Sequence, residues 1–433
     1  MRDEGAGRRG RAGRAARAAL VDTSSITSDP AFRRLWLGQL VSELGRQVVI
    51  IAMPFEIYIR TQSTLAIGAL AAVELVSIFG LSLPAGALVD SMDRRRLLLA
   101  TQTTLLITTL VLLATALLPD LPLLLVYACG LALSAMTAID RPARKAALFS
   151  IVRPELMNSA VAVDQAANQV GSVLGPAIGG ALIGVGGLAA AFAAAGLGFG
   201  FMLVSLAGLR TPLARNLGGV RRVQGMRDGL AFVLGHPAVL STMAIDFTAM
   251  VFGFPSALFP VLAVSVYHVG APGLGLLAGA PAAGALVASL LSGAVTAIRR
   301  KGMAIIGFVV LWGFAIACVG LLSFSFPLAL AFLAIAGACD IAAAVLRASI
   351  VQKVTPDAMR GRVASINYIA VSGGPRLGDV EATAVASLTS VGFSIFTGGL
   401  LCVAGTLLVA SRFPALRHYI ERPPEAGRAA VAT

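Results

Sequence analysis

The chain has 433 residues, of which 57% are hydrophobic and 13% are charged, and its mean hydropathy is +0.87. This composition excludes a soluble enzyme of that length and indicates that most of the chain lies in lipid. The net charge of +13 could suggest a nucleic-acid partner, but the basic residues stand between apolar segments, so we expect no binding of nucleic acid.

Apolar segments long enough to cross a bilayer follow one another along the chain. Residues 1–34 form an Arg-rich tail, residues 35–209 a first bundle, residues 210–236 a linker, residues 237–412 a second bundle, and residues 413–433 a second tail. The expected spans lie near 36–60, 64–89, 97–118, 122–142, 157–184, 187–209, 237–264, 271–297, 302–322, 327–347, 362–388 and 391–411. The sequence therefore predicts an all-α polytopic membrane protein with twelve helices in two six-helix bundles.

Basic residues mark alternate connections between these spans. Lysine and arginine collect in cytoplasmic loops, whereas short outer loops contain few of them. The connections at 118–122, 184–187 and 322–327 contain none, and Arg60 is the one exception to the alternation. The pattern predicts a multi-pass protein of the bacterial inner membrane with both tails and the linker in the cytoplasm.

The two halves also repeat each other in sequence. The segment 153–157 aligns with the segment 355–359, which lies 202 residues later, and the same offset pairs Lys145 with Arg347. Repeats of this kind are typical of transporters whose substrate site lies between two bundles at mid-membrane. The sequence contains no Gly-rich loop ending in Gly-Lys-Ser/Thr, so we expect no direct use of ATP.

Ionisable residues inside the expected spans are functional candidates, because each costs about 2.5–3.5 kcal/mol in lipid. In the first span, Glu43 and Arg46 are three residues apart and can pair on one helix face, either to steady the helix or to take part in proton coupling. In the second span, Glu74 has no base on its own helix. We expect Glu74 to be the proton carrier.

A glycine-acid-arginine motif ends the second span. Gly86, Asp90, Arg94 and Arg95 match the signature Gly-x-x-x-Asp-Arg/Lys-x-Gly-Arg-Arg/Lys of the major facilitator superfamily, although two other positions of the signature differ. The sequence therefore resembles that superfamily. The resemblance implies that these residues form a gating motif, in which Asp90 and Arg94 latch the two halves on the cytoplasmic side.

The fifth span carries a second motif. Gly171, Gly175, Pro176, Gly179 and Gly180 fit the pattern Gly-x-x-x-Gly-Pro-x-x-Gly-Gly, which in the same superfamily marks exporters that work by antiport. Small residues four apart also allow close helix packing, which is the plainer interpretation. Over nearly its whole length the chain is most similar to the branch that contains the enterobactin exporter and the macrolide efflux proteins.

Three further carboxylates lie in the fifth, seventh and tenth spans. Asp164 shares a helix face with Asn168 and Gly171, where it could contact either polar cargo or water. Asp246 and Asp340 are further candidates for proton coupling or for the cavity wall.

The eleventh span combines a helix-breaking segment with three charges. Arg376, Asp379 and Glu381 follow the segment Gly373-Gly374-Pro375, which we expect to bend or break the helix. Arg376 and Asp379 are three residues apart and can pair. We expect this cluster to border the central cavity.

Together these features predict a secondary active exporter of amphipathic small molecules, either a siderophore or a hydrophobic drug, that works by alternating access and proton antiport. An exposed Arg376 would favour an anionic siderophore, whereas exposed carboxylates beside a paired Arg376 would favour cationic drugs. The alternatives are a transport-inactive membrane receptor or assembly partner, and a lipid-translocating relative. We expect a monomer in the lipid bilayer that is no enzyme, holds no metal ion and needs no cofactor beyond the proton gradient.

Overall fold

The computed structural model describes residues 24–208, 222–322 and 324–419, with side chains over these ranges except at 81–91, 149, 222–226 and 358. These ranges consist of helices joined by short connections and contain no β-strand. Eight of the described helices are long and apolar enough to cross a membrane. The all-α polytopic fold is confirmed.

Six long segments make up the first half of the described chain. They are α3 (Pro30–Thr61), α4 (Thr64–Ser91), α5 (Arg94–Leu117), α6 (Leu124–Ile151) and the two parts of α7 (Met157–Ala207), which meet at Gly187. Gly187 has φ 68°, a left-handed conformation that glycine adopts without strain, so the chain reverses there almost without a loop. Two short elements, α2 (Ser24–Ser28) and η1 (Pro154–Leu156), complete this half.

The second half begins with α8 (Arg222–Gly235), which packs against α9 (Pro237–Phe252) and α15 (Arg360–Leu388). The span that starts with α9 continues through η2 (Ser256–Leu258), α10 (Phe259–Val261) and η3 (Leu262–Val266). The other long helices are α11 (Gly270–Leu290), α13 (Lys301–Leu321), α14 (Phe326–Val354), α15 and α16 (Val391–Arg412), and the short elements are α12 (Ser292–Thr296), η4 (Asp357–Met359) and α17 (Pro414–Arg417). With α7 counted as two, the described helices are consistent with the twelve expected.

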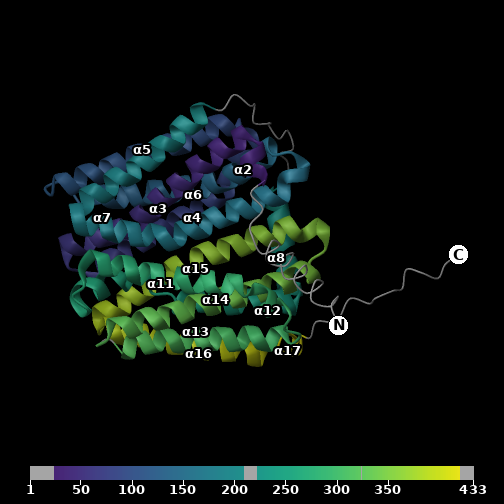
Figure 1. Ribbon diagram of the computed structural model, residues 1–433. Helices are drawn as coiled ribbons and strands as arrows, with labels where there is room; N and C mark the ends of the chain where they lie inside the picture. The colour runs from purple at the N-terminus through teal and green to yellow at the C-terminus, as the bar shows by residue number, and fades with distance from the viewer. Residues whose placement is uncertain (1–23, 209–221, 323, 420–433) are drawn as a thin grey trace, which may run out of the picture.

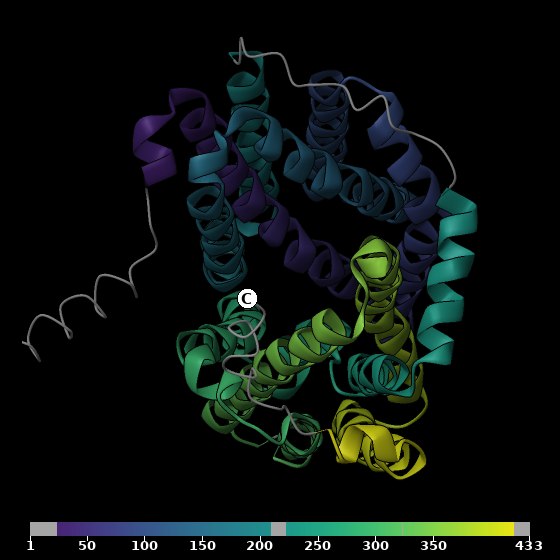
Figure 2. The ribbon, with the colours of Figure 1, turned by 90° about the vertical axis from the view of Figure 1, so that its right-hand side faces the viewer.

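The long helices lie side by side, with the first half above the second in Figure 1. The short elements α2, α8, α12 and α17 gather at one end of this stack, which also carries both ends of the described chain. We call this the terminal end and the opposite one the distal end. Figure 2 looks onto the terminal end and shows the two halves facing each other.

Polar side chains at helix starts explain where several spans begin. Asp29 accepts hydrogen bonds from the backbone N–H groups of Ala31 (2.9 Å) and Phe32 (3.2 Å), and Pro30 occupies the first helical position of α3. Asp93 accepts one from the N–H of Arg96 (3.0 Å) at the start of α5. Asp93 stands where the superfamily signature has glycine, and its role here is that of an N-cap.

The break expected in the eleventh span is instead found in the seventh. The helix α15 runs through Gly373–Pro375 without interruption, so the hypothesis of a break there is wrong, while a bend stays a prediction. Gly374 and Gly378 pack closely on α9. The seventh span is interrupted after Phe252, at Gly253-Phe254-Pro255. Its freed Gly253 carbonyl accepts a hydrogen bond from Trp312 Nε1 at 2.8 Å, which satisfies a backbone group that lipid could not.

Arg60, the exception among the basic residues, is neutralised inside the first half. Its Nη1 lies 3.2 Å from Oε1 of Glu56, a carboxylate that is only 1% exposed. Nη2 of Arg60 also donates to the carbonyl oxygens of Pro119 (3.1 Å) and Leu121. Arg60 therefore links α3 to the α5–α6 connection at the distal end. Sequence analysis did not identify Glu56 as the partner of Arg60.

Candidate functional site: a cavity between the two halves

The two halves meet closely toward the distal end. A Cβ atom placed on Gly180 of α7 would lie 2.6 Å from the Ala271 carbonyl oxygen and 2.7 Å from the Cα atom of Gly275 on α11. Only glycine permits this approach, because any side chain would overlap the opposing backbone. The hydroxyl groups of Tyr58 on α3 and Ser265 on η3 form a hydrogen bond across the same junction. We call these contacts the distal seal.

Replacing Tyr58 by phenylalanine removes one hydrogen bond from the distal seal and keeps the ring. We expect a shift of about 1 kcal/mol toward the state that is open at the distal end, the typical net value of one such bond. The measurement is the rate at which a membrane-impermeant maleimide labels a cysteine introduced in place of Ser256, compared with the same cysteine in the presence of Tyr58. An unchanged rate would show that the bond contributes nothing to the seal.

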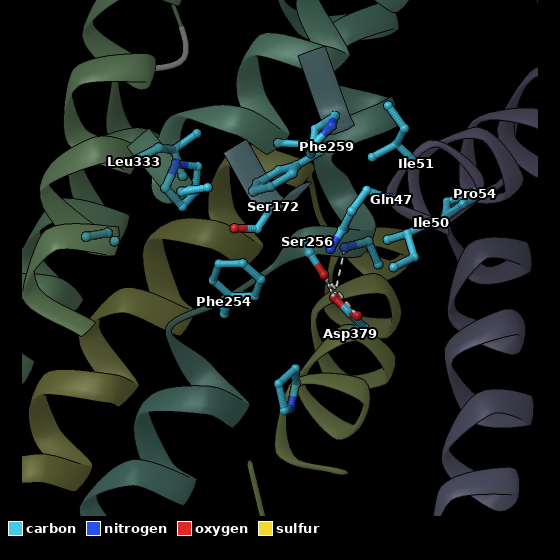
Figure 3. A pocket seen from close by; sticks show the side chains of 18 of the residues that line it. Gln47, Ile50, Ile51, Pro54, Ser172, Phe254, Ser256, Phe259, Leu333 and Asp379 are labelled. Carbon is cyan, nitrogen blue, oxygen red and sulfur yellow. Dashed lines mark hydrogen bonds between the residues drawn. The ribbon is translucent and has the colours of Figure 1, made fainter. Parts of the chain in front are cut away.

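A cavity of about 480 Å³ lies between the halves below the seal. Figure 3 shows Ile50, Ile51 and Pro54 of α3 on one side of it and Leu333 of α14 on the other. Aromatic side chains from the broken seventh span, Phe254 and Phe259, enlarge the apolar surface. Cavities of this size, apolar with a few polar groups, commonly hold one small organic molecule.

An ion pair joins the halves at the wall of this cavity. Nε of Arg376, on α15, lies 2.8 Å from Oε2 of Glu74, on α4. The Glu74 side chain is 12% exposed and that of Arg376 29% exposed. Sequence analysis had left Glu74 without a partner on its own helix, and the tertiary structure supplies one from the other half.

Asp379 is the third charged residue of this cluster, beside Glu74 and Arg376. Its Oδ2 lies 3.2 Å from Nη1 of Arg376, which confirms the expected pairing within α15. Its Oδ1 also accepts hydrogen bonds from Ser256 Oγ (2.9 Å) and from the backbone N–H of Ala257 (2.8 Å). The break in the seventh span therefore supplies hydrogen-bond donors to the buried Asp379 carboxylate. Of the three charges expected at the cavity, Arg376 and Asp379 line it and Glu381 does not.

A second cavity of about 870 Å³ adjoins the first on the side of the terminal end. It lies within the second half, between α9, α14 and α15, and Asp340 and Ile341 line both cavities. Nη2 of Arg347 lies 2.5 Å from Oδ1 of Asp246 and 3.7 Å from Oδ1 of Asp340. The structure thus brings two candidate carboxylates together around one arginine, which sequence analysis had noted only as a repeat partner of Lys145.

The pair Glu43–Arg46 forms as expected, within α3 and buried. Gln47 Nε2 also donates to Glu43 Oε1 at 3.0 Å. Gln47 lines the central cavity, whereas Glu43 and Arg46 line neither cavity. Of the two interpretations, this geometry fits the pair that steadies its helix, and a role in proton coupling stays a prediction.

Two other candidates lie outside the cavity walls. Asp164 accepts a hydrogen bond from Gln39 of α3, and the residues that α7 contributes to the central cavity include Gln169 and Ser172. Glu381 is half-buried on α15 and lines neither cavity. Neither residue therefore lines one of the two cavities.

The gating motif is only partly visible. Gly86 and Asp90 belong to α4, but their side chains lie outside the described residues. Arg94 Nη1 donates to the Ala146 carbonyl oxygen at 2.9 Å, and Arg95 Nη2 donates to that of Ala207 at 2.9 Å. Both contacts lie within the first half, so the latch between Asp90 and Arg94 stays a prediction.

The antiporter motif is a packing surface. A Cβ atom on Gly171 would lie 2.7 Å from Cγ of Glu43, and one on Gly179 would lie 2.8 Å from Cδ1 of Ile51, so these glycines let α7 lie directly on α3. Gly180 points elsewhere and meets α11 of the other half. The motif thus joins α7 to α3 on one face and forms the distal seal on another.

A buried pair in α6, Asp140 with Arg144, was missed by sequence analysis. Asp140 also accepts hydrogen bonds from Thr101 Oγ1 (3.1 Å) and Gln102 Nε2 (2.8 Å) on α5. The spacing of four residues was a readable signal, but Asp140 stood at the end of the expected span 122–142 and Arg144 just beyond it, so no pair was predicted.

Comparison with known proteins agrees with this architecture. Residues 23–423 match the family model described as transmembrane secretion effector. The chain belongs to this family of the major facilitator superfamily. It is 27% identical over 414 residues to the enterobactin exporter of Escherichia coli strain K12, covering 94% of this chain and 97% of that protein. The enterobactin exporter of Citrobacter koseri is 27% identical over 413 residues, with the same coverage.

Solved structures show the same fold at low sequence identity. One is a bacterial homologue of the human lysosomal transporter Spinster in an inward-facing and unoccupied conformation. It has a TM-score of 0.71 at 14% identity, and the match covers 91% of this chain and 98% of that chain. A bacterial homologue of the iron transporter ferroportin, also inward-facing, has a TM-score of 0.66 at 14% identity, with 90% and 98% coverage. The family and its relatives are transporters, and the chain is a multi-pass membrane protein.

Proposed function

We propose that the chain is a secondary active exporter of amphipathic small molecules that works by alternating access and exchanges protons for its substrate. The observation that carries the proposal is the ion pair between Glu74 and Arg376, because it joins the two halves at the wall of the substrate cavity. A bond at this place must break when the halves separate, so the charge state of Glu74 bears directly on which state is populated.

Protonation of Glu74 is coupled to the separation of the halves, because a charged carboxylate is costly to desolvate. While Arg376 lies beside it, the Glu74 carboxylate is compensated inside the membrane. Once the halves part at this level, an uncompensated charge costs several kcal/mol, and protonation removes that cost. Asp379 stays with Arg376 on the same helix, so the arginine keeps one partner throughout the cycle.

The proposed orientation places the terminal end in the cytoplasm of a bacterial inner-membrane protein. The helices α5, α13 and α15 begin at this end with Arg94, Lys301 and Arg360, and cytoplasmic loops collect such residues. The distal seal would then close the outer side. The larger cavity, on the side of the terminal end, would be the entrance for substrate from the cytoplasm.

The relatives named enterobactin exporters make a catecholate siderophore one candidate cargo, and the apolar cavity makes a hydrophobic drug another. The test is uptake into inverted vesicles that contain the purified chain, with an inward-acid pH gradient, of enterobactin and of the drug-like dye ethidium. We expect uptake of at least one compound to depend on the gradient and to vanish when an ionophore collapses it. Uptake of neither compound, or uptake indifferent to the gradient, would contradict the proposal.

A further inference from the structure

Two arginines in the second half each stand between two carboxylates. Arg376 contacts Glu74 and Asp379, and Arg347 contacts Asp246 and Asp340. Each group, with both acids ionised, carries one negative charge more than it can neutralise. Buried charges need compensation, so each group is suited to hold one further positive charge.

The excess charge of the second group resides on Asp340. Arg347 lies 2.5 Å from Asp246, whose side chain is 6% exposed, but 3.7 Å from Asp340, whose side chain is 30% exposed. Asp340 is therefore the loosely held partner. It also lines both cavities, so its carboxylate lies where they adjoin.

The group around Arg347 is also incomplete in its hydrogen bonds. Arg347 is 8% exposed, and its Nη1 has no hydrogen-bond partner among the described residues. By contrast, Asp379 in the first group is bound by Ser256, Ala257 and Arg376 together. The group around Arg347 is therefore bonded less completely than the group around Asp379, and because a guanidinium N–H can only donate, a cation would have to bind at the carboxylate of Asp340.

We propose that Asp340 binds the positive charge of a lipophilic organic cation where the two cavities meet, so that the exporter's substrates include cationic amphipathic molecules. This inference rests on the proposed function and names its substrate class. Apolar residues that line the central cavity together with Asp340, among them Ile341, Leu333 and Trp312, fit the body of such a molecule. The charge balance of the central cavity disfavours an anion, because its walls carry three carboxylates and one arginine, namely Glu74, Asp340, Asp379 and Arg376.

The test measures equilibrium binding to the purified full-length chain in detergent, without any gradient. The probes are tetraphenylphosphonium and tetraphenylborate, which have matched size and opposite charge. We expect the wild type to bind the cation more tightly than the anion, and Asp340→Asn to weaken cation binding by ~10-fold or more, as loss of a charge about 4 Å away implies. Asp340→Glu should restore most of the affinity.

The matched control is Asp228→Asn, which removes a 51% exposed acid of α8 that pairs with Arg362, and neither of these residues lines a cavity. We expect this variant to bind both probes like the wild type. Equal cation binding by Asp340→Asn and the wild type, preference for the anion, or no binding of either probe would each overturn the cation site. Should Asp340→Asn fail to fold, photolabelling of the wild type with an azido derivative of the cation decides, since label away from α9, α14 and α15 contradicts the site.

The two experiments distinguish a failure of the cation site from a failure of the proposed transport function. Cation binding that depends on Asp340, without proton-driven transport by the wild type, would refute the proposed function and leave the site intact. Transport of the cation that is unchanged in Asp340→Asn would refute the site and leave the exporter intact.

Discussion

Replacing Glu74 by glutamine is expected to reduce proton-driven transport at least ~10-fold, because breaking a buried ion pair costs about 3–5 kcal/mol and a neutral amide cannot exchange a proton. Glutamine keeps the size of the side chain and can still accept a hydrogen bond from Arg376. Exchange of substrate for substrate across the membrane, which needs no net proton movement, should persist. The measurement compares uptake driven by a pH gradient with counterflow in the same vesicles.

The matched control for this variant is Glu381→Gln. It makes the same chemical change at a half-buried position of α15 that lines neither cavity. We expect it to transport like the wild type in both assays. Gradient-driven uptake that survives Glu74→Gln would remove Glu74 from the coupling mechanism, and a loss that also affects counterflow would indicate that the residue binds substrate or holds the halves together.

Replacing Gly180 by valine is expected to prevent closure of the distal seal and to reduce net transport more than ~10-fold. The new side chain would meet the backbone of Ala271 and Gly275 at distances where atoms overlap, and a carrier that cannot close one side cannot complete its cycle. The populated state should become open at the distal end. A cysteine introduced in place of Ser265 should then react faster with an impermeant maleimide added on the distal side.

Gly200→Val, in the second part of α7, separates this effect from a general cost of valine in α7. A Cβ atom at Gly200 meets no atom within 4 Å, so the substitution leaves the junction between the halves untouched. We expect near-normal transport and slow labelling of the cysteine at 265 in this variant. Slow labelling in Gly180→Val as well would show that the close approach of α7 and α11 is not what seals the distal side.

Local sequence alone determines the membrane spans, the superfamily and two of the ion pairs. The spans follow from apolar runs of bilayer length, because every backbone group inside lipid must be bonded within its own helix. The repeat and the two motifs indicated the superfamily, and the family model confirms it. The pairs Glu43–Arg46 and Arg376–Asp379 were predicted because residues three apart share a helix face.

The site itself was decided by the tertiary structure. The partner of Glu74 lies about three hundred residues away on α15, and Asp246 meets Arg347 from another helix. Helical periodicity cannot predict these contacts, because they depend on how separate helices pack against each other. The break was expected in the eleventh span but lies in the seventh, for the same reason. Glycine and proline weaken a helix wherever they occur, but the neighbouring helices decide whether it stays continuous. Packing on α9 keeps α15 continuous, whereas near Gly253 hydrogen bonds with Trp312 and Asp379 satisfy the backbone groups that a break frees.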